Sequence, residues 1–155
     1  MFNAGMKTRS LQPNPFMCGD EERFESLGAQ VCLKANAEQT GGAFDLFDAV
    51  CPPGFATPLH IHYAEDVAIL VLEGFLTFFW GDEKRQAGAG TFLFQPQGTP
   101  HGFRVNGDSP AHILYLTIPA GFEGFILGHQ PTTQISEPEE DAARYKIEIL
   151  GPLPT

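Results

Sequence analysis

Two histidine-bearing segments decide how this sequence is interpreted: residues 54–62, Gly-Phe-Ala-Thr-Pro-Leu-His-Ile-His, and residues 96–101, Pro-Gln-Gly-Thr-Pro-His. His60 and His62 are two residues apart, so on a β-strand both imidazoles point to the same face. His101 follows a turn rich in glycine and proline and enters another predicted strand. Three imidazoles on neighbouring strands can bind one divalent ion, and imidazole suits zinc, iron, nickel and copper.

Short apolar runs surround these segments and are typical of β-strands of four to eight residues. They are separated by turns rich in glycine, proline, asparagine and aspartate, with no helical period between them. This pattern predicts an all-β antiparallel sandwich or barrel. The predicted strands are Gln30–Lys34, Ala43–Val50, Val67–Glu73, Phe75–Trp80, Thr91–Gln95, Gly102–Val105 and His112–Ile118.

The 155 residues suit a single domain with three segments. We expect an N-terminal arm over residues 1–28, with residues 1–26 as an irregular arm or a short edge strand, a β-barrel over 29–120, and a C-terminal helical segment and tail over 121–155. Helical signals are confined to this last segment, in Phe122–Leu127 and from Pro138 onward. Val67–Leu72 and Phe75–Trp80 are apolar on both faces, which predicts a second packing surface such as that of a homodimer.

Composition excludes several classes of partner. Nineteen acidic and nine basic residues give a formal charge of −10, so neither nucleic acid nor an anionic membrane is an expected partner. The three cysteines are odd in number and lack CxxC spacing, which argues against a disulfide framework and fits a reducing compartment. The first seven residues contain no apolar core of signal-peptide length, and no run of about 18 apolar residues occurs in the sequence, so we expect a cytoplasmic protein.

The two histidine segments resemble the two motifs of the cupin family. The first motif, G-x5-H-x-H-x3–4-E-x6-G, is matched by Gly54, His60, His62 and Gly74. The second, G-x5-P-x-G-x2-H-x3-N, is matched by Gly90, Pro96, Gly98 and His101, with Asn106 one position late. The flanking sequence is similar to that of small quercetin-dioxygenase-like cupins. The resemblance implies a double-stranded β-helix of jelly-roll type, with His60, His62 and His101 as metal ligands.

One ligand of the family motif is absent. Counting back from Gly74 and forward from His62 both lead to Val67, where the family has glutamate. Glu65 has the correct strand parity but lies in the predicted turn, whereas Asp66 has the opposite parity. Either carboxylate reaches the site only if the backbone bends. A site of three neutral histidines is more electropositive and lacks the proton acceptor that glutamate provides in related enzymes.

Strand alternation places Val67, Ile69 and Phe103 on the same side as the histidines, and we predict that they bind substrate in an apolar cavity. Such a cavity suits an aromatic or polyketide-like molecule. Tyr63 and Glu65 are either substrate contacts or ordinary turn residues. We interpret the remaining candidates as structural: His112 as packed or at an edge, His129 as capping or exposed, and Cys51 as a buried thiol.

The resemblance implies a metal-dependent, dioxygenase-like enzyme that acts on a small phenolic, enolic or polyketide-like substrate. The cofactor is a divalent ion of iron, nickel, copper or zinc, or none. Three alternatives remain. The first is a metal-free isomerase, cyclase or dehydratase with His60, His62 and His101 as acid or base. The others are a non-enzymatic small-molecule binder and a vestigial structural domain, because fold does not fix function.

Overall fold

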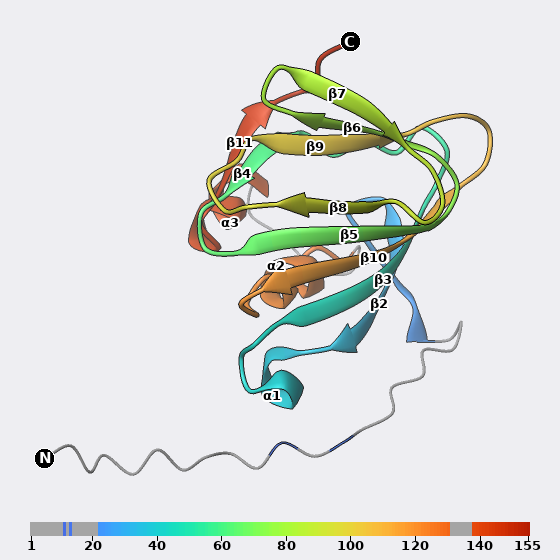
Figure 1. Ribbon diagram of the computed structural model, residues 1–155. Helices are drawn as coiled ribbons and strands as arrows, with labels where there is room; N and C mark the ends of the chain where they lie inside the picture. The colour runs from blue at the N-terminus through green and yellow to red at the C-terminus, as the bar shows by residue number, and fades with distance from the viewer. Residues whose placement is uncertain (1–10, 12, 14–21, 131–137) are drawn as a thin grey trace, which may run out of the picture.

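The structure is a computed structural model that describes residues 11, 13, 22–130 and 138–155 (Figure 1). Two antiparallel sheets face each other, which confirms the predicted all-β jelly-roll fold. The first sheet has the order β1 (Phe24–Ser26), β2 (Ala29–Ala35), β3 (Asp45–Cys51), β10 (Ala111–Ile118), β5 (Asp66–Glu73), β8 (Phe92–Gln95). The second has the order β11 (Ile147–Gly151), β4 (Leu59–His62), β9 (His101–Val105), β6 (Leu76–Trp80), β7 (Glu83–Ala87).

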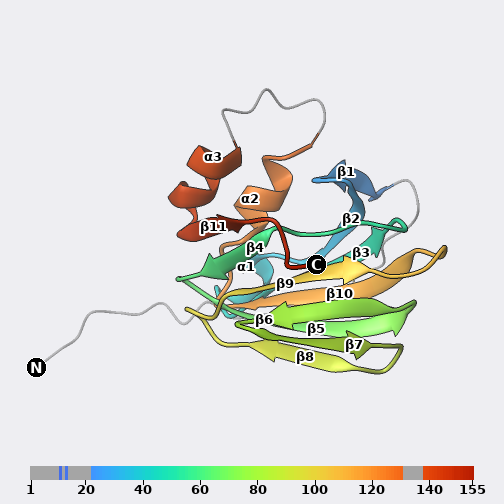
Figure 2. The ribbon, with the colours of Figure 1, turned by 90° about the horizontal axis from the view of Figure 1, so that it is seen from above.

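Three short helices complete the described fold: α1 (Ala37–Thr40), α2 (Glu123–Leu127) and α3 (Pro138–Arg144). α1 begins with a capping box in which Asn36 accepts from the Gln39 amide, while the Gln39 side chain accepts from the Asn36 amide. Viewed from above, α2, α3 and β1 lie on the same side of the two sheets (Figure 2). The two predicted helical segments therefore form helices, and both lie beside the barrel.

The core lies between the sheets and is built by strand alternation. In the first sheet Tyr115 of β10 is opposite Phe47 on one side and Ile69 on the other, so these three side chains share the inner face. Val67 is opposite Thr117 and Gln95 in the next row. Apolar burial between the two inner faces is the main source of stability for such a sandwich.

Gly74 shows why the sequence needs glycine at the β5–β6 turn. Its φ is +89°, in the left-handed region that glycine adopts without strain. A Cβ at this position would lie 2.7 Å from the Pro110 carbonyl oxygen and 2.8 Å from the Ala111 Cα. The turn can therefore pack directly against the start of β10 only because no side chain is present.

Four strands lie outside those predicted from apolar runs, and one of them, β4, is the strand expected from the spacing of His60 and His62. β7 consists of Glu-Lys-Arg-Gln-Ala and is an exposed edge strand, so it carries almost no hydrophobic signal. β1 lies within the predicted arm and pairs with β2. β11 lies within the predicted C-terminal helical segment and returns to the barrel beside β4, where Ile147 is opposite His62 and Ile149 is opposite His60. The barrel therefore extends beyond residues 29–120.

Two other expectations concern cysteines and membranes. Cys51 is a buried free thiol, whereas Cys32 is disulfide-bonded, which the odd cysteine count did not predict. Among the helices of the described residues, none is both long and apolar enough to cross a membrane.

Candidate metal centre

Three histidines converge between the sheets. His60 and His62 lie on β4, His101 begins β9, and His60 is directly opposite His101 in the strand register. Their potential ligand atoms all lie within 4.8 Å of one another. His62 and His101 are 1% and 3% exposed, whereas His60 is half-buried. The structure therefore brings together the three residues that the two sequence motifs single out.

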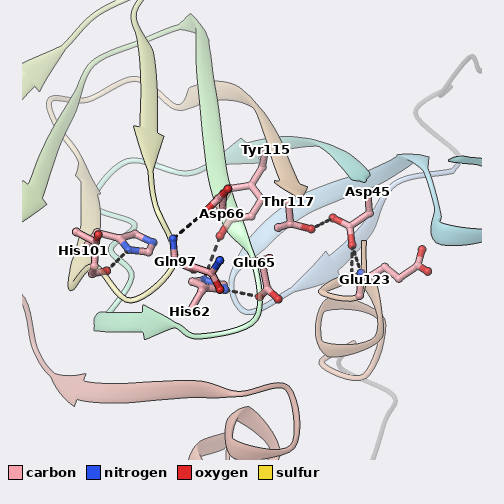
Figure 3. Close-up of polar contacts among 11 residues, drawn as sticks. Asp45, His62, Glu65, Asp66, Gln97, His101, Tyr115, Thr117 and Glu123 are labelled. Atoms are coloured by element: carbon pink, nitrogen blue, oxygen red, sulfur yellow. Dashed lines mark hydrogen bonds and ion pairs between the residues drawn. The ribbon is translucent and has the colours of Figure 1, made fainter. Parts of the chain in front are cut away.

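Each imidazole is held by a hydrogen bond from its Nδ1. His60 donates to the Pro58 carbonyl oxygen at 2.8 Å, and His101 to the Thr99 carbonyl oxygen at 2.9 Å. His62 Nδ1 lies 2.7 Å from the Glu65 carboxylate (Figure 3). Carbonyl and carboxylate oxygens only accept hydrogen bonds, so the proton of each neutral ring resides on Nδ1 and the lone pair on Nε2.

This donor set fits a divalent metal ion. In protein metal sites the second nitrogen of a ligating histidine characteristically donates to a carbonyl or carboxylate oxygen, as all three histidines do here. The Nε2 of His101 is buried and has no hydrogen-bond partner among the described residues. A buried acceptor without a partner is costly, and a bound ion would remove that cost.

Burial keeps two of these imidazoles neutral. It lowers the pKa of His60 to about 3, with further lowering from the neighbouring His101 and His62. Burial likewise lowers the pKa of His101 to about 4. Both rings are therefore uncharged at neutral pH, which is the form that binds a metal ion.

The two carboxylates that precede Val67 take different directions. Glu65 is 4% exposed and turns inward, but it lies behind His62 and is not among the clustered ligand atoms. Asp66 instead accepts a hydrogen bond from the Gln97 amide at 2.9 Å (Figure 3). Neither carboxylate occupies the position of the missing glutamate, and Glu65 orients a histidine instead.

Val67 is completely buried on the inner face of β5. Its neighbours across the strands are Thr117 and Gln95. The Gln95 amide is itself buried, and neither of its polar atoms has a partner among the described residues. An aliphatic side chain thus occupies the position of the family carboxylate, and the buried amide beside it has no partner among the described residues.

The histidines open into an apolar cavity of about 310 Å³ between the sheets, a volume in the range of small-molecule sites. Ile69 and Phe103 line this cavity, as strand parity predicts, whereas Val67 does not. Phe122, at the start of α2, and Ser26, at the end of β1, also line it. Substrate binding by these residues remains a prediction.

Comparison with known proteins identifies the family. Residues 47–118 match the family model described as a cupin domain. The chain therefore contains a cupin domain over these residues. Quercetin 2,3-dioxygenase of Bacillus subtilis is 33% identical to this cupin over 108 residues, 69% of this chain and 32% of that protein. An uncharacterized protein of Methanocaldococcus jannaschii is 32% identical over 74 residues, 48% of this chain and 59% of that protein.

This cupin therefore spans about a third of the length of the first relative and 59% of the second. Among solved structures, KdgF from Halomonas sp. superposes with a TM-score of 0.63. That alignment covers 71% of this cupin and 99% of that chain at 20% sequence identity, a likeness that shows the shared fold.

Tyr115 is a member of the site that sequence reasoning missed. Its hydroxyl oxygen lies 3.4 Å from the Nε2 of His62, and its ring lines the cavity. Burial raises the pKa of this phenol, so the hydroxyl keeps its proton. The signal that would have found it is the pairing of Tyr115 with Ile69, and this register belongs to the folded sheet rather than to a local motif.

Asp45 fixes α2 against the site of this cupin. Its carboxylate accepts hydrogen bonds from the Thr117 hydroxyl and from the amides of Gly121 and Glu123, at 3.1 and 3.0 Å for the two amides. Burial raises the pKa of this carboxyl, opposed by these hydrogen bonds. The bonds hold Phe122, whose ring meets that of His62 edge-on at 5.0 Å between centroids.

The remaining candidates lie outside the histidine cluster. His112 contacts Asp48 at 2.7 Å, in agreement with its predicted structural role. His129 is buried and donates to the Phe125 carbonyl oxygen at 2.5 Å, so of the two expected roles the structure supports helix capping. Burial raises the pKa of the Cys51 thiol to about 12, which makes it unreactive. Tyr63 is half exposed and donates to Glu148 at 2.6 Å.

Proposed function

We propose that this cupin is a metal-dependent enzyme that acts on a small phenolic, enolic or polyketide-like substrate in a dioxygenase-like reaction. One observation carries the proposal: the three histidines present clustered ligand atoms, each ring held by an Nδ1 hydrogen bond, at the wall of an apolar cavity. His60, His62 and His101 would hold a divalent ion of iron, nickel, copper or zinc.

A divalent ion on three neutral imidazoles keeps its full charge and would attract a phenolate or enolate oxygen. The protein residues supply orientation and exclusion of water. Glu65 fixes the His62 ring, while Ile69 and Phe103 give the cavity apolar walls. Val67 cannot take a proton from the substrate. Another group must therefore accept the proton, or the substrate must bind in its ionised form.

The similarity to quercetin 2,3-dioxygenase of Bacillus subtilis supports this class of substrate. That name describes a protein of which this chain spans about a third, so the activity enters here only as part of the proposal. The apolar lining of the cavity supports an aromatic substrate independently, because a sugar or a phosphate would leave its polar groups without partners.

Oxygen consumption tests the proposal. Untagged protein is loaded separately with Fe²⁺, Ni²⁺, Cu²⁺ or Zn²⁺ and mixed with quercetin, catechol or acetylacetone in an oxygen electrode. We expect at least one redox-active metal to support consumption that His101→Ala abolishes. His112→Ala is the matched control, because His112 lies outside the cluster and pairs with Asp48. No consumption with any combination would contradict a dioxygenase-like activity.

A metal-free proton-transfer enzyme, such as an isomerase, cyclase or dehydratase, is the second candidate. The observation that favours it is the chain of contacts from the Glu65 carboxylate through His62 to the Tyr115 hydroxyl, at 2.7 and 3.4 Å (Figure 3). A hydroxyl, an imidazole and a carboxylate in this order is an arrangement used for proton transfer. Turnover that survives exhaustive chelation would favour this candidate, and ligand binding without turnover would favour a non-enzymatic binder.

We also propose that the protein forms a homodimer. Phe92 and Phe94 are 64% and 53% exposed on β8, the edge strand of the six-stranded sheet. Phe75, in the β5–β6 turn, is 63% exposed. Exposed aromatic side chains on an unpaired edge favour association with a second copy. Sedimentation at micromolar concentration should show a dimer that Phe94→Lys dissociates, and a single monomer peak for the wild type would contradict the proposal.

A further inference from the structure

Among the described residues, three hydroxyl groups line the cavity, and their polar contacts differ. Ser26 donates to the Ile126 carbonyl oxygen at 2.7 Å. The Thr57 hydroxyl oxygen accepts from the Phe103 amide at 3.1 Å. The third hydroxyl, on Tyr115, has its one described polar contact with His62 Nε2 at 3.4 Å. An oxygen–nitrogen distance of 3.4 Å is long for a hydrogen bond, so the Tyr115 donor is only weakly engaged.

Tyr115 is nevertheless held firmly in place. It lies in the middle of β10, between Phe47 of β3 and Ile69 of β5, and its ring packs against Phe122 with 5.6 Å between centroids. Side chains fixed on strands position a hydrogen-bonding group more accurately than loops do. The hydroxyl therefore lies at the side of the cavity that His62 lines.

The surroundings of this hydroxyl define what it can recognise. The histidine nitrogens that face the cluster are acceptors, because the proton of each ring is on Nδ1. Most other side chains that line the cavity are apolar. In the metal-free protein, a ligand oxygen that approaches His62 thus meets lone pairs and hydrocarbon, and the Tyr115 hydroxyl is the donor that contacts His62 among the described residues.

We propose that Tyr115 donates a hydrogen bond to a phenolic or enolic oxygen of the ligand and so selects ligands that carry this oxygen over apolar molecules of the same shape. The inference rests on the proposed function for the class of substrate. It adds the residue that orients the substrate beside His62. The role requires only the neutral hydroxyl and is independent of which metal is bound.

Paired probes test the inference: 2-naphthol, which has a phenolic oxygen, and 2-methylnaphthalene, which has a methyl group in its place. Binding of each is measured by fluorescence titration, with the protein both free of metal and loaded with Zn²⁺. We expect Tyr115→Phe to weaken 2-naphthol binding about tenfold, the size of one hydrogen bond, and to leave 2-methylnaphthalene binding within about twofold.

Tyr63→Phe is the matched control, because the Tyr63 hydroxyl donates to Glu148 and the residue does not line the cavity. It should bind both probes as the wild type does. Equal weakening of both probes by Tyr115→Phe would mean that the ring only packs, and would overturn the inference. Unchanged 2-naphthol binding in Tyr115→Phe, or no binding by the wild type, would overturn it as well.

Zinc titration separates this inference from the proposed function. We expect Tyr115→Phe to bind Zn²⁺ as tightly as the wild type, and a parallel loss of zinc affinity would assign Tyr115 to the metal site instead. If the wild type binds no metal but distinguishes the two probes through Tyr115, the proposed metal enzyme fails and the recognition role stands.

Discussion

Removing the charge of Glu65 should weaken metal binding although Glu65 is not itself a candidate ligand. Its carboxylate lies 2.7 Å from His62 Nδ1, and the two side chains are only 5% and 1% exposed, so solvent screens the interaction little. The carboxylate fixes the ring orientation and makes Nε2 a stronger donor to a metal ion. Loss of such a supporting partner typically costs 10- to 100-fold in metal affinity.

Two variants of Glu65 should differ in how much metal affinity they lose. Glu65→Gln keeps an acceptor oxygen but removes the charge, so we expect about a tenfold loss of Zn²⁺ affinity. Glu65→Ala also leaves the buried Nδ1–H of His62 without a partner, so we expect about a 100-fold loss. The second variant should in addition lower the free energy of unfolding by about 1–3 kcal/mol.

Competition with a chromophoric zinc chelator measures these affinities. Asp66→Asn is the matched control. It also removes one negative charge, but the Asp66 side chain accepts a hydrogen bond from the Gln97 amide and does not contact His62. Zinc affinity of Glu65→Gln within twofold of the wild type would refute the orienting role. An equal loss in Asp66→Asn would mean that only the general field of the two carboxylates matters.

Three further predictions concern Val67, Asp45 and the protonation of the histidines. Val67→Glu should raise Zn²⁺ affinity in the same chelator competition and lower apo-protein stability, because a carboxylate is buried without metal; equal effects of Val67→Gln would contradict a ligand role. Asp45→Ala should lower the free energy of unfolding, measured in urea, by about 3 kcal/mol, since three hydrogen bonds are lost. An unchanged free energy of unfolding would contradict the role of Asp45 in fixing α2. The folded-state pKa values of His60 and His101, about 3 and about 4, lie below the ordinary 6.5, so the unfolded chain binds more protons below pH 6.5. The metal-free protein should therefore be less stable at pH 5 than at pH 7.5 in urea titrations, with a smaller difference in His101→Asn.

The sequence predicts the fold and the three histidines because both depend on local rules. Alternation along a strand sets His60 and His62 on one face, and the glycine and proline turns mark where strands end. Gly74 illustrates the link between motif and structure, since its position in the motif coincides with a left-handed turn packed against β10. The opposed strands β4 and β9 then bring His101 to the pair.

The rest of the site depends on pairings between distant segments. Glu65 is the exception, because it lies only three residues after His62 and has the strand parity noted in the sequence, and the turn before β5 brings its carboxylate to His62 Nδ1. Tyr115 enters the site through the register of β10 with β3 and β5. β11 is short and follows α3, so nothing in its own sequence indicates that it pairs with the histidine strand. Such contacts are set by tertiary structure and have no local signal.

Metal content of the purified protein tests the central claim most directly. The protein is produced without an affinity tag and supplemented with Fe²⁺, Ni²⁺, Cu²⁺ or Zn²⁺. Loosely bound ions are removed, and the metal content is measured by elemental mass spectrometry. A site formed by His60, His62 and His101 predicts close to one equivalent of at least one of these metals per chain, lost in His101→Ala and retained in His112→Ala. A wild-type protein that stays free of metal after every supplementation would contradict the three-histidine metal centre.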